Sequence, residues 1–88
     1  MKVEFLSRFH KDLDEIHSSS AKKSIAKLIG PIELVPDIRQ IPNIKKLQGF
    51  KNAFRIRMGD YRLGIFYELE VIQFARIKHR KDIYKVFP

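Results

Sequence analysis

The most constraining feature of this sequence is the alternation of apolar and polar residues on both sides of Gly59-Asp60. A period of two is typical of a β-strand, because successive side chains point to opposite faces of a sheet. Gly and Asp between two such runs favour a tight turn, so the pattern predicts a β-hairpin. If the loop has two residues, Arg57 lies directly across from Arg62.

This register sorts the hairpin side chains onto two faces. The first is apolar and suits packing against helices, and it consists of Phe54, Ile56, Met58, Tyr61, Leu63, Ile65 and Tyr67. The second is predicted to face solvent and carries Arg55, Arg57, Arg62, Gly64 and Phe66, with space beside Arg55 opposite the glycine. Facing arginines repel each other, so the pair makes most sense with a bound anion such as phosphate. A solvated face on which arginine stems cover apolar surface would show the same pattern.

The N-terminal half predicts a strand and two helices. Lys2–Leu6 alternates and predicts an opening strand. Apolar residues at helical spacing follow Ser7, which suits a helix N-cap, and again follow the three serines at 18–20. Gly30-Pro31 should end or kink the second helix, and the proline-rich stretch 31–42 predicts irregular or partly helical structure.

The C-terminal half predicts a three-stranded antiparallel meander, because Val71–Ile77 follows the hairpin after a turn. A basic tail, Lys78–Lys85, follows that strand. The fold class is therefore α+β: an N-terminal strand and a two-helix hairpin packed on one face of a mainly antiparallel β-sheet. A chain of 88 residues predicts one domain, 1–88.

Composition narrows the function. The sequence has 18 Lys and Arg against 10 Asp and Glu, a formal net charge of +8, and residues 45–88 carry seven of those charges. Basic charge gathered in one half indicates a polyanion or an acidic protein as partner.

Cysteine is absent, which excludes disulfides, thiolate zinc sites and a cysteine nucleophile. His10 and His17 lack ligand spacing, so no metal is expected. No secretory signal or spanning segment is recognisable, so we expect a soluble, cytoplasmic protein without membrane contact.

Three runs of residues together resemble a known family. They are Lys46–Gly49, Arg55–Arg62 and His79–Tyr84, which read K-L-x-G, R-I-R-x-G-x-Y-R and H-R-x-x-x-Y. In this order and spacing they are similar to the RelE/ParE superfamily of toxins from bacterial and archaeal toxin–antitoxin pairs. The resemblance spans essentially the whole chain.

In its RelE branch, the resemblance implies an endoribonuclease that inhibits translation by cutting messenger RNA in the ribosomal A site, without metal or another cofactor. A ribose 2′-OH attacks the adjacent phosphate, which requires a base, cationic stabilisation and an acid. The matching positions assign catalysis to Arg62, which stabilises phosphate, to His79 and Arg80 as acid, base or stabiliser, and to Tyr84, which orients or stacks on substrate. We expect substrate binding by Arg55, Arg57, Lys51, Lys78 and Lys81.

One departure weakens a direct transfer of mechanism. Arg55 and Arg57 stand where some RelE members carry lysines, and arginine is a poor general base. We therefore assign proton transfer to His79, with the arginines as electrostatic stabilisers. Taken alone, His79 fits an ordinary surface histidine, and Tyr84 fits an anchor that packs the tail onto the sheet.

Two alternatives remain open: a ParE-like toxin that inhibits DNA gyrase without nuclease activity, and a basic nucleic-acid-binding module. The resemblance implies a cognate antitoxin, acidic or amphipathic, that covers the apolar and basic surfaces. Ribosome and messenger RNA are the other expected partners. DNA binding is expected only as a toxin–antitoxin complex.

Overall fold

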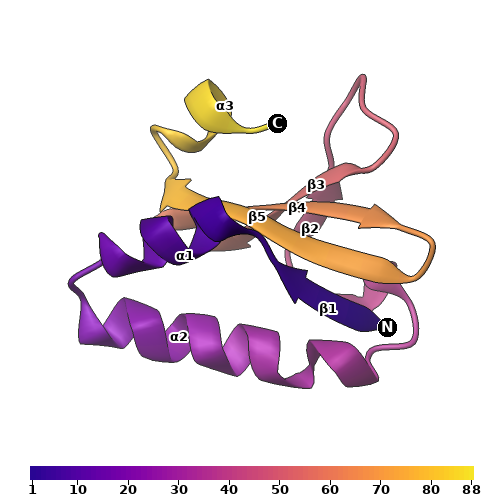
Figure 1. Cartoon of the computed structure of the whole chain (residues 1–88), viewed down its shortest axis with the longest axis horizontal. Helices are drawn as coiled ribbons and strands as arrows, with labels where there is room; N and C mark the ends of the chain where they lie inside the picture. Colours follow the sequence, from indigo (N-terminus) through magenta and orange to yellow (C-terminus); the bar gives the residue numbers. More distant parts are fainter.

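The computed structural model describes residues 1–88 and contains one five-stranded sheet (Figure 1). Its elements in chain order are β1 (Lys2–Phe5), α1 (Ser7–Asp14), α2 (Ser19–Ile29), two 3-10 turns (Gly30–Leu34 and Ile38–Gln40), β2 (Ile44–Lys46), β3 (Ala53–Met58), β4 (Tyr61–Glu68), β5 (Val71–His79) and α3 (Ile83–Val86). None of the helices combines the length and the apolar composition that crossing a bilayer requires.

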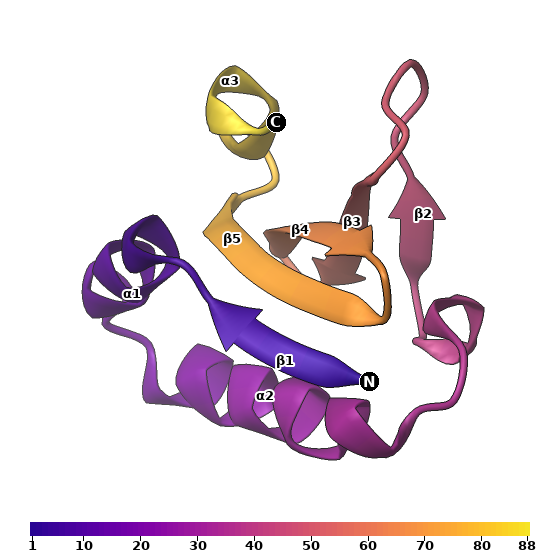
Figure 2. The same cartoon turned by 45° about the vertical axis from the view of Figure 1, so that its right-hand side comes forward.

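The strands lie in the order β1-β5-β4-β3-β2. β1 runs parallel to β5, and all the other neighbouring strands are antiparallel. α2 lies on one side of the sheet and α3 on the other (Figure 2). The predicted α+β class, with an N-terminal strand and helices packed on a mainly antiparallel sheet, is confirmed.

The hairpin has the predicted two-residue loop, since Met58 pairs with Tyr61 and Arg57 with Arg62. Gly59 has a φ of 57°, in the left-handed region that glycine adopts without steric strain. Because side chains alternate along each strand, this register fixes which hairpin residues share a face.

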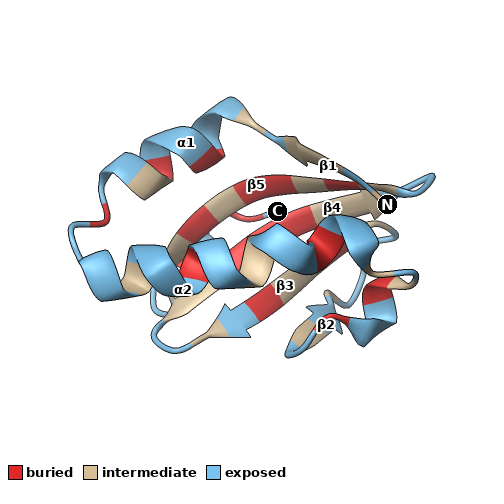
Figure 3. Ribbon diagram, turned by 90° about the horizontal axis from the view of Figure 1, so that it is seen from below, coloured by how far each residue is buried: buried red, intermediate tan, exposed pale blue.

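The predicted apolar face of the hairpin is confirmed as the floor of the main core, and we call it the helix face. Ile56, Leu63 and Ile65 are fully buried there (Figure 3). Both N-terminal helices contribute to the same core, through Phe9 of α1 and Ile25 of α2. Burial of these side chains stabilises the fold by about 1.5–3 kcal/mol for each large one.

The two N-terminal helices begin with different caps. Ser18 caps α2, because its Oγ accepts a hydrogen bond of 3.1 Å from the backbone N–H of Ala21. Ser7 is the first helical residue of α1 and not its cap, so that prediction was wrong: Leu6 holds the cap position without a side-chain bond. At Gly30 the α-helix tightens into a 3-10 turn, since the following proline has no N–H to donate.

The opposite face of the sheet, which we call the arginine face, is less open than predicted. A second small core covers its middle, formed by Ala53, Ala75, Ile83 and Phe87. The space expected beside Gly64 is filled by the ring of Phe87. Phe66, predicted to face solvent, is half-buried against that ring at a centroid distance of 5.0 Å.

Two elements were absent from the sequence prediction. β2 has only three residues and becomes a strand by pairing with β3. The expected basic tail is divided: Lys78 and His79 belong to β5, and four residues from Ile83 form α3. The tail therefore returns over the arginine face instead of extending into solvent.

Candidate functional site

The central feature of the arginine face is the arginine pair, Arg57 on β3 and Arg62 on β4. Their Cα atoms are register partners, so both side chains leave the same face of the hairpin. Arg62 Nη1 donates to the carbonyls of Gly59 at 2.7 Å and Tyr61 at 2.9 Å. These bonds fix one guanidinium above the turn, while Arg57 remains exposed.

Further cations extend the pair across the sheet. Arg55 lies two residues before Arg57 on the same face, and its Nη1 donates to the Asn43 carbonyl at 2.9 Å. Lys45 of β2 is the register partner of Arg55. Sequence reasoning missed Lys45 because its strand is too short to show a period of two.

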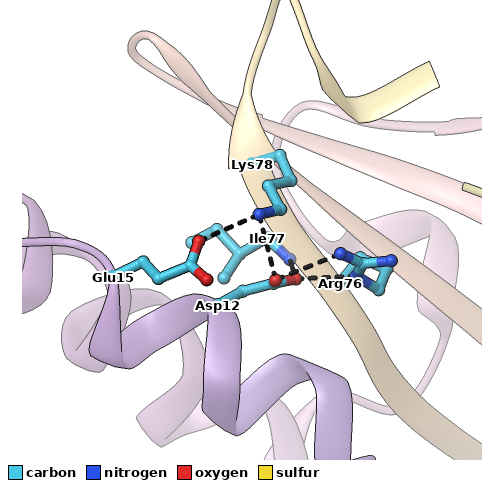
Figure 4. A network of polar contacts seen from close by, with 5 residues as sticks. All are labelled: Asp12, Glu15, Arg76, Ile77 and Lys78. Carbon is cyan, nitrogen blue, oxygen red and sulfur yellow. Dashed lines mark hydrogen bonds and ion pairs between the residues drawn. The ribbon is translucent and has the colours of Figure 1, made fainter. Parts of the chain in front are cut away.

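None of Arg55, Arg57, Arg62 and Arg80 forms an ion pair with a carboxylate. The cations of β5 differ: Arg76 Nε lies 2.8 Å from Asp12 Oδ2, and Lys78 Nζ lies 3.1 Å from Glu15 Oε2 (Figure 4). The positive charge available to an anion therefore concentrates on the hairpin and on the residues after β5.

Asp12 is the carboxylate that neutralises the cations of β5. Its carboxylate accepts hydrogen bonds from Arg76 and from the backbone N–H of Ile77 at 3.0 Å, and it lies 3.4 Å from Lys78 Nζ. Burial alone raises the pKa of Asp12. The hydrogen bonds and the two cations together lower it by more than burial raises it, so the pKa of Asp12 lies below its usual value.

The sequence held a signal for this network. Asp12 lies on the apolar stripe of α1, three residues after Phe9 and one before Leu13. It is the only charged residue that is buried, with an exposed fraction of 4%. An acidic residue on an apolar helix stripe indicates a buried cationic partner.

His79 does not share the face of the arginine pair. It is the register partner of Tyr61, whose side chain packs on the main core, whereas Lys78 is the partner of Arg62. The His79 Nδ1 accepts a hydrogen bond of 3.1 Å from the backbone N–H of Lys81. In the neutral ring that bond places the proton on Nε2, which is then a donor.

The other predicted site residues occupy both ends of the sheet. The backbone N–H of Arg80 donates to the Asp60 carbonyl at 2.7 Å, which brings this residue beside the hairpin turn. Lys81 follows it and is exposed. Lys51 precedes β3 and so lies at the far end of that strand from Arg57, on the order of 15–20 Å away.

Tyr84 lies on α3, on the same side of the sheet as the arginine pair. Its side chain is 56% exposed, so it is not the anchor that fixes the tail. Ile83 and Phe87 perform that role, because both are buried. A ring held in solvent above a basic face can stack on a nucleobase.

Two other features lie outside this cluster. No three His, Cys, Asp or Glu side chains come together as a metal-binding group. A groove of about 410 Å³ is lined on the helix-face side by apolar residues that include Ile38, Phe54 and Tyr67. Neither Arg57 nor Arg62 lines this groove, so the arginine pair lies outside it.

Comparisons with known proteins agree with this architecture. The family described as "ParE toxin of type II toxin-antitoxin system, parDE" matches residues 3–84. "Toxin RelE3" of Methanocaldococcus jannaschii is 38% identical over 89 residues, covering 100% of both chains.

Solved structures show the same fold. The RelB–RelE antitoxin–toxin complex from Methanococcus jannaschii matches with a TM-score of 0.83 and 35% identity, over 97% of this chain and 99% of that one. The archaeal RelE–RelB complex from Pyrococcus horikoshii OT3 matches with a TM-score of 0.71 and 22% identity, over 93% and 97%. With its length and fold both matched by these relatives, the chain belongs to the RelE/ParE superfamily of type II toxin–antitoxin toxins.

Proposed function

We propose that this protein is the toxin of a toxin–antitoxin pair and that it cleaves messenger RNA on the ribosome. One observation carries the proposal: Arg57 and Arg62 face each other on an exposed strand surface without any carboxylate to neutralise them. Like charges across a strand pair are unfavourable by a few tenths to about 1 kcal/mol. A phosphate between two guanidinium groups would reverse this repulsion.

The proposed reaction is the one that the resemblance to the RelE branch implies. A ribose 2′-oxygen forms a bond to the adjacent phosphorus, and the bond from phosphorus to the 5′-oxygen breaks. The 2′-OH gives its proton to a water molecule, and the departing 5′-oxygen receives one from His79, which leaves a cyclic phosphate and a free 5′-hydroxyl. Arg57 and Arg62 would stabilise the charge that develops on the phosphorane oxygens.

The remaining residues take supporting roles in this proposal. His79 and Arg80 lie at the end of β5, next to the register position of Arg62, and an RNA strand that crosses this end can contact both faces. The Nε2–H of His79 would donate a hydrogen bond to the departing oxygen, and the doubly protonated ring would transfer that proton to it. Arg80 adds charge there, and Tyr84 stacks on a base. Arg55, Lys51, Lys78 and Lys81 would bind the RNA backbone, Lys78 more weakly because it is already ion-paired.

The expected partner is a cognate antitoxin. The two solved relatives described above are complexes of RelE with RelB. A net charge of +8 favours an acidic segment that covers the arginine face and so competes with RNA.

A gyrase inhibitor is the second candidate, because the matching family carries the description of ParE toxins. An arginine face without a positioned base would suit binding to another protein as well as binding to RNA. The two functions act on different targets, messenger RNA and DNA gyrase, so one experiment can separate them.

The test compares purified protein in two assays. In a translation extract we expect truncated message when ribosomes are present and intact message when they are removed. Supercoiling by gyrase should be unaffected. Intact message together with loss of supercoiling would favour the gyrase inhibitor, and no effect in either assay would leave only a nucleic-acid-binding module.

A further inference from the structure

α3 has one anchored side and one exposed side. Ile83 and Phe87 are four residues apart, and the N–H of Phe87 donates to the Ile83 carbonyl at 2.9 Å. Both side chains are buried, with exposed fractions of 0% and 3%. Tyr84 follows Ile83 on the turn and is exposed. The position of the tyrosine ring is therefore set by how the two anchors dock.

The docking surface is a socket of small residues on three neighbouring strands: Ala53 of β3, Gly64 of β4 and Ala75 of β5. The register between β4 and β5 shifts between Gly64 and Ile65, because Gly64 pairs with Arg76 and Ile65 with Phe74. Ala75 is left without a partner and joins the socket. An extra residue in one strand is the usual way in which a bulge redirects a side chain.

Gly64 is the closest point of contact in this socket. A Cβ added there would lie 2.5, 2.6 and 2.7 Å from three ring atoms of Phe87. The backbone of Gly64 does not require glycine, since its φ is outside the left-handed region. Glycine inside a strand weakens it, and a close approach by another group is one of its recognised uses. The packing of Phe87 therefore accounts for the glycine.

We propose that Gly64 and Phe87 are positioning residues for Tyr84. The Phe87 ring fits onto the Cα of Gly64, which holds α3 down on the arginine face and keeps the Tyr84 ring on the same side of the sheet as the arginine pair. This role rests on the proposed function, because it assigns Tyr84 to the RNA. Gly64 and Phe87 themselves do not touch substrate.

The test is Gly64→Ala, measured by ribosome-dependent cleavage. The added methyl group displaces Phe87, so we expect cleavage to fall roughly tenfold, the effect of losing one aromatic–base stack. RNA affinity should fall by no more than the same factor, because the arginine pair still binds phosphate. Gly30→Ala is the matched control, because a Cβ at Gly30 has no atom within 4 Å and should leave cleavage unchanged.

A second comparison separates positioning from general damage to the fold. If Gly64 acts through Tyr84, then Gly64→Ala should reduce cleavage no further in a Tyr84→Ala background. Replacing Phe87 with Leu in Gly64→Ala makes room for the methyl group and should restore part of the activity. Phe87→Ala removes the same contact without a clash. It takes the place of Gly64→Ala if that variant folds poorly, and it should show the same roughly tenfold loss of cleavage.

The possible outcomes are distinguishable. Cleavage by wild type with unchanged cleavage by Gly64→Ala overturns the positioning role alone, and so does a full additional loss in the Tyr84→Ala background. Absence of cleavage by wild type overturns the proposed function and this role with it. Faster tryptic cleavage after Lys85 in Gly64→Ala would report release of α3, and unchanged proteolysis would contradict the socket directly.

Discussion

The Asp12 carboxylate and the Arg76 guanidinium join α1 to β5 through two hydrogen bonds, of 2.8 and 3.1 Å. Asp12 also accepts the backbone N–H of Ile77, on the edge of β5 that β1 leaves uncovered beyond Phe74. One side chain thus satisfies an edge amide, neutralises a cation and docks a helix. Because of Asp12, the cations of β5 are paired, whereas those of the hairpin have no carboxylate partner.

Asp12→Ala should lower the free energy of unfolding by about 3 kcal/mol, the lower end for breaking a buried pair. Arg76 has a side-chain exposure of 13%, so its unpaired charge would be only partly solvated. Urea denaturation measures the change. Asp14→Ala, on the same helix but exposed and without an ion pair, should change stability by less than about 0.5 kcal/mol. Equal effects of the two variants would show that Asp12 contributes little.

The pKa of Asp12 makes stability depend on pH in the acid range. Folding lowers this pKa, so the stabilisation by Asp12 is complete above the unfolded value, near 3.9. It is lost as the pH falls through the lower folded pKa. Asp12→Asn should therefore show a smaller loss of stability between neutral and acidic pH than wild type, as measured by urea midpoints at several pH values. Parallel pH curves for the two proteins would contradict this linkage.

The parts of the fold that could be predicted are those in which local pattern and tertiary packing agree. The alternation around Gly59-Asp60 fixed the register of the hairpin, and with it both faces. Ile44–Lys46 could not be predicted as a strand, because three residues show no period and only pairing with β3 makes them one. Gly64 was interpreted as open space, since nothing local shows that a residue 23 positions later fills it.

The candidate site likewise has a part that could be predicted from the sequence and a part that could not. The facing arginines follow from the register, so their convergence was predictable. The tail was not: His79 continues β5 and lies on the face of Tyr61, whereas Tyr84 returns over the arginine face through α3. A strand end and a one-turn helix leave too little periodicity to assign a face from sequence.

Arg62→Ala should abolish growth arrest and lower the cleavage rate by about 10²–10³-fold, as expected for removal of one preorganised donor to a developing oxyanion. The fold should survive, because Arg62 bonds only to backbone carbonyls at the turn. Arg39→Ala is the matched control, since that arginine is paired with Asp37 and lies away from the arginine face. Growth arrest by Arg62→Ala at wild-type strength would remove the arginine pair from the mechanism.

Arg57→Gln should have opposite effects on stability and on RNA binding. Removing one of two facing charges should raise the free energy of unfolding by a few tenths to about 1 kcal/mol. RNA affinity should fall, and its dependence on salt should decrease by about one released counterion. Thermal melts and binding titrations at several salt concentrations measure the two effects, with Lys23→Gln on exposed α2 as the control. A less stable Arg57→Gln protein would contradict the repulsion on which the phosphate site is argued.

Two substitutions at His79 separate its structural from its chemical role. The Nδ1 accepts the N–H of Lys81, so Asn, whose side-chain oxygen can occupy the position of Nδ1, should preserve that turn while removing the donor at Nε2. Gln places its amide near the position of Nε2 but loses the turn bond. If the donor acts on the departing 5′-oxygen, His79→Asn should lower single-turnover cleavage by about 10²-fold or more with little change in stability or RNA affinity.

Comparison of the two variants completes this last test. A neutral amide cannot transfer a proton, so His79→Asn and His79→Gln should both lose cleavage, although only His79→Asn keeps the turn bond. Single-turnover rates of the two variants measure this loss. Should His79→Asn cleave as fast as wild type, the imidazole only holds the turn before α3. Proton transfer would then have to come from the arginine face or from the ribosome.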